Sequence, residues 1–197
     1  MKRSILPLVC ICFASFGMFG QESQDKLPYY EIPEYPESYT PGSVAARMID
    51  GLGFRYYWAT EGLREEDLAF KPNEEARTSA ETIDHIYGLS KTIINSALHK
   101  PNVRGGSEEA MTFAEKRKKT LENFKTAADI LRTATDLSGY TIVFQNGDQR
   151  NEYPFWNHIN GPIADAIWHC GQVVSFRRSS GNPFNSKVSV FSGTVRQ

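Results

Sequence analysis

The 197-residue chain has few cysteines, almost no net charge and no internal repeat. Two of its three cysteines, Cys10 and Cys12, lie in the apolar N-terminal segment, so Cys170 is the one thiol left for the rest of the chain. A single remaining thiol excludes an internal disulfide. The net charge is −1, and no stretch of Lys and Arg is interleaved with aromatic residues. No nucleic-acid partner is therefore expected.

The chain does contain enough apolar material for one core. Hydrophobic residues make up 40% of the sequence and aromatic residues 12%, which suits a single domain of this length. One basic run is present, Lys116 to Lys119, and acids at 108, 109, 115 and 122 surround it. We expect this run to form a solvated helix face.

The N-terminus has the pattern of an export signal. The basic pair Lys2-Arg3 precedes an apolar stretch over 5–19, which is too short to span a bilayer comfortably. Cleavage after Gly17 and after Gly20 are both compatible with the sequence. We expect residues 1–20 to be removed, which changes the net charge from −1 to −3. The mature protein would then be exported, periplasmic or secreted, without a transmembrane anchor.

Residues 21–42 have the composition of an extended arm. Prolines alternate there with tyrosines: Pro28, Pro33, Pro36 and Pro41 with Tyr29, Tyr30, Tyr35 and Tyr39. This pattern disfavours a helix. We expect the arm to lie on the domain surface, and a tail that binds a partner is the alternative.

Four segments with helical periodicity follow, and they predict an all-α fold, a four-helix bundle over residues 43–183. The expected helices cover 41–64, 79–99, 107–138 and 162–180. Thr40 before Pro41 fits an N-cap, and Thr78 with Glu81 forms a capping box.

The remaining connections and the C-terminal tail are less regular. A β-prone run over 140–144 precedes the tight-turn signal Asn146-Gly147. The tail, residues 184–197, is short and β-prone. Its segment from Lys187 to Phe191 fits either a strand or a surface arm.

The fourth predicted helix carries a pair of metal-ligand residues. Asp165 and His169 are four residues apart, so both side chains leave the same helix face one turn apart. One helix can then offer two ligands to a divalent metal ion. A third ligand must come from elsewhere, and His85 in the second predicted helix is the best candidate.

Each of these ligands has a structural alternative. Asp165 could simply favour the N-terminal dipole of its helix. His85 could be a partly buried histidine of an amphipathic helix, and His169, next to Trp168, a hydrogen-bonded core residue. Together, three ligand-type residues in this context favour the metal site.

Several other residues are weaker candidates for the same site. Glu81 could be a fourth ligand, but the capping box already occupies its carboxylate. His158 could approach the site from a loop, either to hydrogen-bond a ligand residue or to contact a substrate. Gln172 lies three residues after His169, on nearly the same helix face, and could hydrogen-bond a ligand residue. Cys170 should point about 100° away and pack in the core rather than act as a reactive thiol. His99 lies roughly 21 Å along its helix from the site.

These motifs resemble the DinB/YfiT-like family of metal-binding four-helix proteins. The resemblance rests on the loop Phe70-Lys71-Pro72, the segment from Glu81 to Ile86, and His169-Cys170-Gly171-Gln172, and it covers residues 44–183. It implies that His85 and His169 are ligands of a divalent metal, usually zinc or nickel. Asp165 stands where the family more often has His. This departure leaves a set of two His and one carboxylate, which also suits Fe(II).

A site of this kind predicts a metal-dependent activity on a small molecule. Hydrolysis with metal-bound water as the nucleophile is the expected function. The resemblance implies an alternative, a thiol-dependent transferase, which export away from cytosolic thiols disfavours. A non-catalytic metal-binding or interaction module is the third reading. The oligomeric state stays open, a dimer included, and the sequence names no substrate.

Overall fold

The structure is a computed structural model that describes residues 26–105 and 110–197. The export signal predicted at 1–20 and the helix start predicted at Ser107 lie outside these residues. The helices are α1 (Pro41–Thr60), α2 (Glu65–Ala69), α3 (Ser79–Ala97), α4 (Phe113–Arg132), α5 (Trp156–His158), the π-helix η1 (Ile159–Ile163) and α6 (Ala164–Ser179). The strands are β1 (Asn102–Val103), β2 (Ile142–Asn146), β3 (Gln149–Tyr153), β4 (Val188–Ser189) and β5 (Thr194–Val195).

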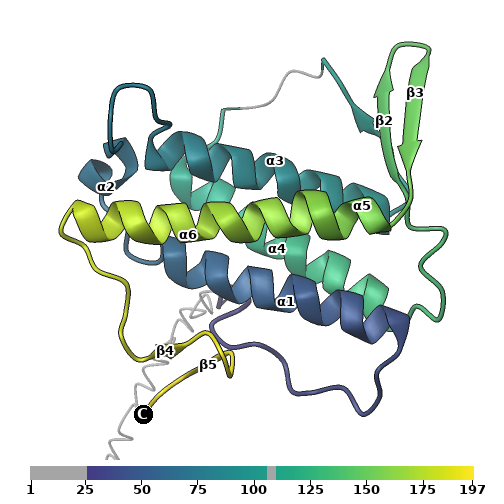
Figure 1. The fold of residues 1–197 in the computed structure, drawn as a ribbon, viewed down its shortest axis with the longest axis horizontal. Helices are drawn as coiled ribbons and strands as arrows, with labels where there is room; N and C mark the ends of the chain where they lie inside the picture. The colour runs from purple at the N-terminus through teal and green to yellow at the C-terminus, as the bar shows by residue number, and fades with distance from the viewer. Residues whose placement is uncertain (1–25, 106–109) are drawn as a thin grey trace, which may run out of the picture.

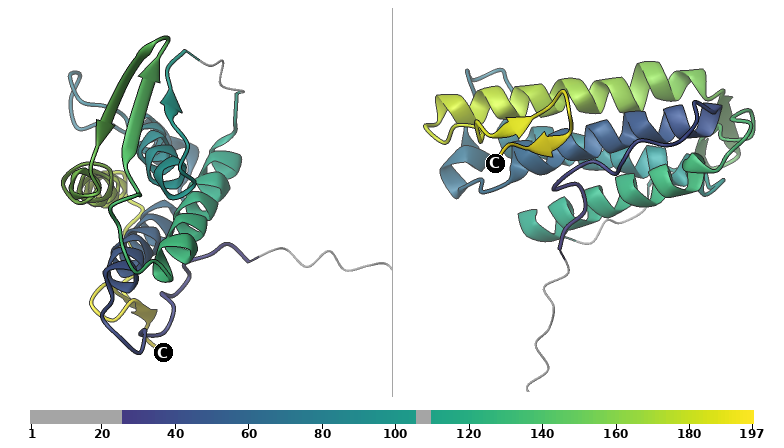
Figure 2. Two further views of the ribbon diagram at one scale, coloured as in Figure 1. Left: turned by 90° about the vertical axis from the view of Figure 1, so that its right-hand side faces the viewer. Right: turned by 90° about the horizontal axis from the view of Figure 1, so that it is seen from below.

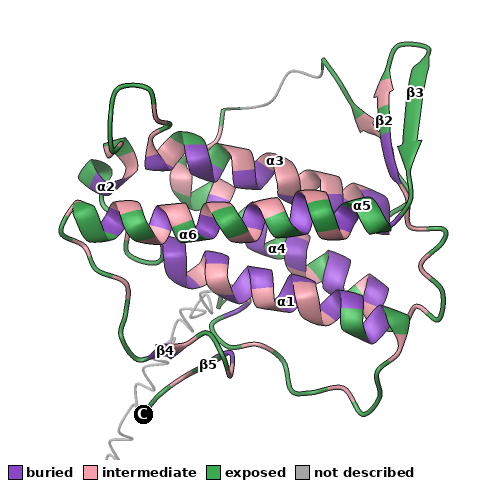
Figure 3. Ribbon diagram, viewed as in Figure 1, coloured by how far each residue is buried: buried purple, intermediate pink, exposed green. Residues whose placement is uncertain are grey.

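Four long helices form the body of the molecule. Helices α1 and α3 each pack against both α4 and α6, so the four enclose one core (Figures 1 and 2). Their buried faces turn inward and their exposed faces outward (Figure 3). The largest fully buried side chains include Tyr56, Phe124, Ile49, Leu52, Ile83 and Ile86. Burial of this apolar surface is the main stabilising contribution to the fold.

The prediction of an all-α four-helix bundle is wrong, because the described residues also form two sheets and the fold is mixed α/β. Strand β2 pairs antiparallel with β3 and parallel with β1, and β4 pairs antiparallel with β5. The β2–β3 hairpin turns at Gly147 and projects from the helices (Figure 1). Every residue of β3 is exposed, so its sequence lacks the apolar alternation that would have predicted a strand.

Local signals set the starts of α1 and α3 as predicted. Thr40 accepts a hydrogen bond from the amide of Ser43, and Thr78 forms a capping box with Glu81. Helix α4 begins after an unpredicted capping box, in which Thr112 pairs with Glu115. Helix α1 ends at Thr60, earlier than predicted, and Gly62 follows with a φ of 65°. Glycine tolerates this left-handed conformation without steric cost.

The last helix does not start at Pro162 as predicted. Helical structure begins at Trp156 and continues through the π-helix η1 into α6. Gly161 departs from helical geometry, with φ −96° and ψ −108°, and this local break accommodates the proline that follows. Gly161-Pro162 is thus a kink within a helical segment rather than its beginning.

The N-terminal arm is anchored to α1 by buried contacts. The Tyr29 ring occupies the space beside Gly53, where a Cβ atom would lie 2.4 Å from it. The Tyr29 hydroxyl donates to Asp50 at 3.2 Å, and Arg132 pairs with the same carboxylate. Burial raises the pKa of both Tyr29 and Asp50. Tyr39, by contrast, is fully exposed.

The C-terminal tail folds back against the arm. The amide of Ile32 donates to the carbonyl of Gly193, and the amide of Val195 donates to Glu31. Of the predicted segment from Lys187 to Phe191, only Val188–Ser189 forms a strand.

The basic run from Lys116 to Lys119 is only partly a solvated face. Arg117 is buried, and its guanidinium donates to Thr60 and pairs with Glu61 at the end of α1. The prediction is wrong for this residue, because a local charge pattern does not reveal which side chain faces a neighbouring helix.

Across the described ranges, no helix combines the length and apolarity that crossing a membrane requires.

Candidate metal centre

Helix α3 presents His85 toward α6. The preceding residue, Asp84, pairs with Lys116 of α4, and consecutive helical residues diverge by about 100° around the axis. His85 therefore points to a different neighbour than Asp84 does. Its Nε2 lies 3.0 Å from Oδ2 of Asp165. The His85 side chain is 35% exposed, so solvent reaches it.

Helix α6 supplies the other two groups from adjacent turns. Oδ1 of Asp165 lies 3.2 Å from Nε2 of His169. The carboxylate therefore bridges the two imidazoles, one oxygen to each. The rings of His85 and His169 meet edge to face, with centroids 4.7 Å apart. One ligand atom from each of the three residues lies within 4.8 Å of the others.

Gln172 orients one of these imidazoles. Its Oε1 lies 2.7 Å from Nδ1 of His169. An amide oxygen only accepts hydrogen bonds, so Nδ1 must carry the proton. Nε2 of neutral His169 is then free of its proton and available to a metal. Outer hydrogen bonds of this kind fix the tautomer of most metal-binding histidines.

The donor set and its spacing fit a divalent transition metal. Two His nitrogens and a carboxylate oxygen suit zinc, nickel or Fe(II). Ligands about 2.0–2.2 Å from a tetrahedral ion lie about 3.3–3.6 Å from one another. The Asp165 separations of 3.0 and 3.2 Å are close to this range. The cluster could hold a metal ion, and the spacing leaves the identity of the metal open.

The structure brings together some of the predicted residues and separates others. His85, Asp165 and His169 form one cluster, and Gln172 contacts its edge. The sequence suggested that His158 lies in a loop at the site, and this prediction is wrong. His158 ends α5, is 2% exposed, and neither ring nitrogen has a hydrogen-bond partner. Burial lowers its pKa to about 4.

Two further alternatives are settled by their surroundings. The Glu81 carboxylate accepts hydrogen bonds from the amide and hydroxyl of Thr78, at 2.8 and 3.1 Å, so it caps α3. Cys170 is 2% exposed and belongs to the core. Burial raises the pKa of its thiol to about 12. The thiol is therefore protonated at neutral pH and is a poor nucleophile.

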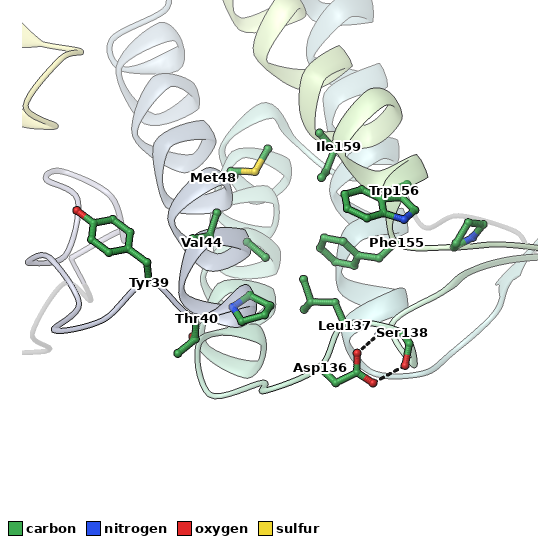
Figure 4. Close-up of a pocket in the computed structure, with 13 residues that line it drawn as sticks. Tyr39, Thr40, Val44, Met48, Asp136, Leu137, Ser138, Phe155, Trp156 and Ile159 are labelled. Carbon is green, nitrogen blue, oxygen red and sulfur yellow. Dashed lines mark hydrogen bonds between the residues drawn. The ribbon is translucent and has the colours of Figure 1, made fainter.

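A cavity beside the N-terminal arm lies apart from the cluster. It has a volume of about 690 Å³ and is lined mainly by apolar residues of the arm, α1 and α5, with Asp136 and Ser138 at one edge (Figure 4). None of the three ligand-type residues contributes to its walls. The cluster is thus an accessible site on the α3–α6 surface rather than the floor of this cavity.

Comparison with known proteins returned no matching family model, no matching curated protein and no matching solved structure.

Sequence reasoning missed one feature of the site, the bridging of both imidazoles by Asp165. The helical spacing predicts that Asp165 and His169 are neighbours. The contact with His85 joins residues 80 apart, and no local pattern encodes it.

Proposed function

We propose that this protein binds one divalent transition metal ion through His85, Asp165 and His169, and uses it for hydrolysis of a small molecule. The observation that carries the proposal is the convergence of three ligand atoms from two helices. The hydrogen bond between Gln172 and His169 supports it, because it presents the metal-binding nitrogen to the cluster.

Such a site would leave coordination positions for solvent. The side chains of His85 and Asp165 are each 35% exposed, so water and a substrate can reach the site from one side. A divalent ion held by three protein ligands can lower the pKa of a bound water and polarise a carbonyl. Zinc and nickel suit the two imidazoles best.

A non-catalytic metal-binding module is the second candidate. It is favoured by the position of the cavity of about 690 Å³, whose walls include no ligand residue. Substrates usually occupy a concave pocket, so an exposed metal without one is compatible with a structural or carrier role. The resemblance to DinB/YfiT-like proteins stays a prediction, as do thiol-dependent transfer and export.

Hydrolysis is tested with metal-loaded protein and a panel of esters and amides, with and without a low-molecular-weight thiol. Wild type should turn over at least one substrate, and His169→Ala should lose both metal and turnover. The matched control is Cys170→Ser, next in sequence but in the core, which should keep turnover.

The outcomes separate the candidates. Metal binding without turnover on any substrate would contradict the hydrolase and support the binding module. Turnover that depends on added thiol would favour the transferase. Loss of turnover in Cys170→Ser with the metal retained would overturn the assignment of Cys170 to the core.

A further inference from the structure

A second, smaller cavity lies between α1, α6 and the C-terminal tail. Its volume is about 230 Å³. Its apolar wall consists of Phe54, Ile167, Val174, Phe184 and Val190. Gly171 also lines it, and a Cβ atom there would meet nothing within 4 Å. Open apolar space therefore extends to the backbone of α6.

Two arginines line this apolar cavity, Arg55 from α1 and Arg178 from α6. Arg55 donates to the carbonyl of Gly51 at 2.8 Å, an uncharged acceptor. The Arg178 guanidinium forms no hydrogen bond or ion pair with any residue in 26–105 or 110–197. No Asp or Glu lines the cavity. Two positive charges thus lie beside an apolar wall without a counter-charge from the residues that the structure describes.

We propose that this cavity binds a small carboxylate with a short apolar chain. Arginine recognises carboxylates through paired N–H donors, with hydrogen bonds stronger than neutral ones. The aliphatic and aromatic wall would cover the chain. At about 30 Å³ for each water-sized group, 230 Å³ holds about eight such groups. A ligand of hexanoate size fits this volume.

This site is separate from the metal centre. Along α6, Gly171 and Val174 lie on a different face from Asp165 and His169, because each residue advances about 100° around the helix. None of the ligand residues lines the cavity. The failure of one proposal would leave the other standing.

The test is isothermal titration of hexanoate, hexylammonium and hexanol into chelator-treated protein. Chelation prevents the carboxylate from binding to a metal at the other site. Hexanoate should bind saturably in the millimolar range or tighter, and the other two should bind at least about tenfold more weakly. Hexanol matching hexanoate, or no saturable binding of hexanoate, would overturn the proposal.

Variants locate the binding to this cavity. Arg178→Gln, at an exposed position, should weaken hexanoate binding about tenfold, and Arg55→Gln should act in the same direction. Gly171→Leu should fill the cavity and abolish binding. The matched control Arg150→Gln, on the β2–β3 hairpin, should bind as wild type does. Wild-type affinity in both Arg178→Gln and Arg55→Gln would refute the assignment.

Discussion

Replacing His158 with leucine should remove much of the acid sensitivity of the fold. His158 is 2% exposed and both ring nitrogens lack partners. Its pKa is lowered to about 4 in the folded protein, whereas an unfolded histidine has a pKa of about 6.5. Between these values the unfolded chain binds a proton that the folded protein does not. The free energy of unfolding therefore falls as the pH falls from about 6.5 to about 4.

The magnitude follows from the same shift. Each pKa unit corresponds to about 1.36 kcal/mol, so the shift costs the native state about 3 kcal/mol of stability by pH 4. Above pH 6.5 the histidine is neutral in both states and contributes no pH dependence. His158→Leu also removes two unpartnered polar atoms from the core, so its stability near pH 7 should equal or exceed that of wild type.

Urea unfolding of chelator-treated protein, at several pH values from 4 to 7.5, measures the effect. The difference in unfolding free energy between His158→Leu and wild type should grow by about 3 kcal/mol as the pH falls through this window. The control is Ile163→Val, a buried neighbour without a titratable group, which should lose about 1 kcal/mol at every pH. A difference between His158→Leu and wild type that does not change with pH would refute the reasoning.

Substitutions at three other residues test the site and its support. Calorimetric titration with zinc should show weaker binding to Asp165→Ala and retained binding to Asp165→His. Equal zinc affinity in Asp165→Ala and wild type would remove Asp165 from the site. Cys170→Ser should lose about 1–3 kcal/mol in chemical unfolding, because a hydroxyl replaces a core thiol, and it should keep its metal; unchanged stability would contradict the core assignment. Hydrogen bonds from Arg64, Ser180 and Asn182 lower the pKa of Asp67. This carboxylate connects α2 to the end of α6. Asp67→Asn should cost about 2 kcal/mol at neutral pH and less in acid, because below a pH of about 3.9 the unfolded wild-type chain protonates this carboxylate while the folded protein keeps it ionised. An equal cost at both pH values would count against this role.

The features that sequence predicted are those with local causes. The caps at Thr40 and Thr78 depend on residues three positions apart. The pairing of Asp165 with His169 depends on a spacing of one helical turn. Such spacings can be recognised in the sequence, because they involve residues close together in the chain. The same reasoning placed Cys170 away from the ligand face, and it is buried in the core.

The features that sequence missed depend on tertiary contacts. Strand β3 is polar and exposed, so only its pairing with β2 makes it a strand. Arg117 is buried because Thr60 and Glu61 meet it from another helix. The position of His158 before Gly161-Pro162 suggested a loop, whereas His158 ends the short helix α5 and the π-helix follows it.

The metal content of the protein tests the central claim most directly. Protein purified without chelators or a metal-affinity tag should hold about one divalent ion per chain by elemental analysis, because three ligand atoms converge at one place. Zinc or nickel would agree with the imidazole ligands, and Fe(II) would indicate the chemistry of a two-His, one-carboxylate site. Well under half an equivalent, unchanged after zinc, nickel or Fe(II) is added, would contradict the account.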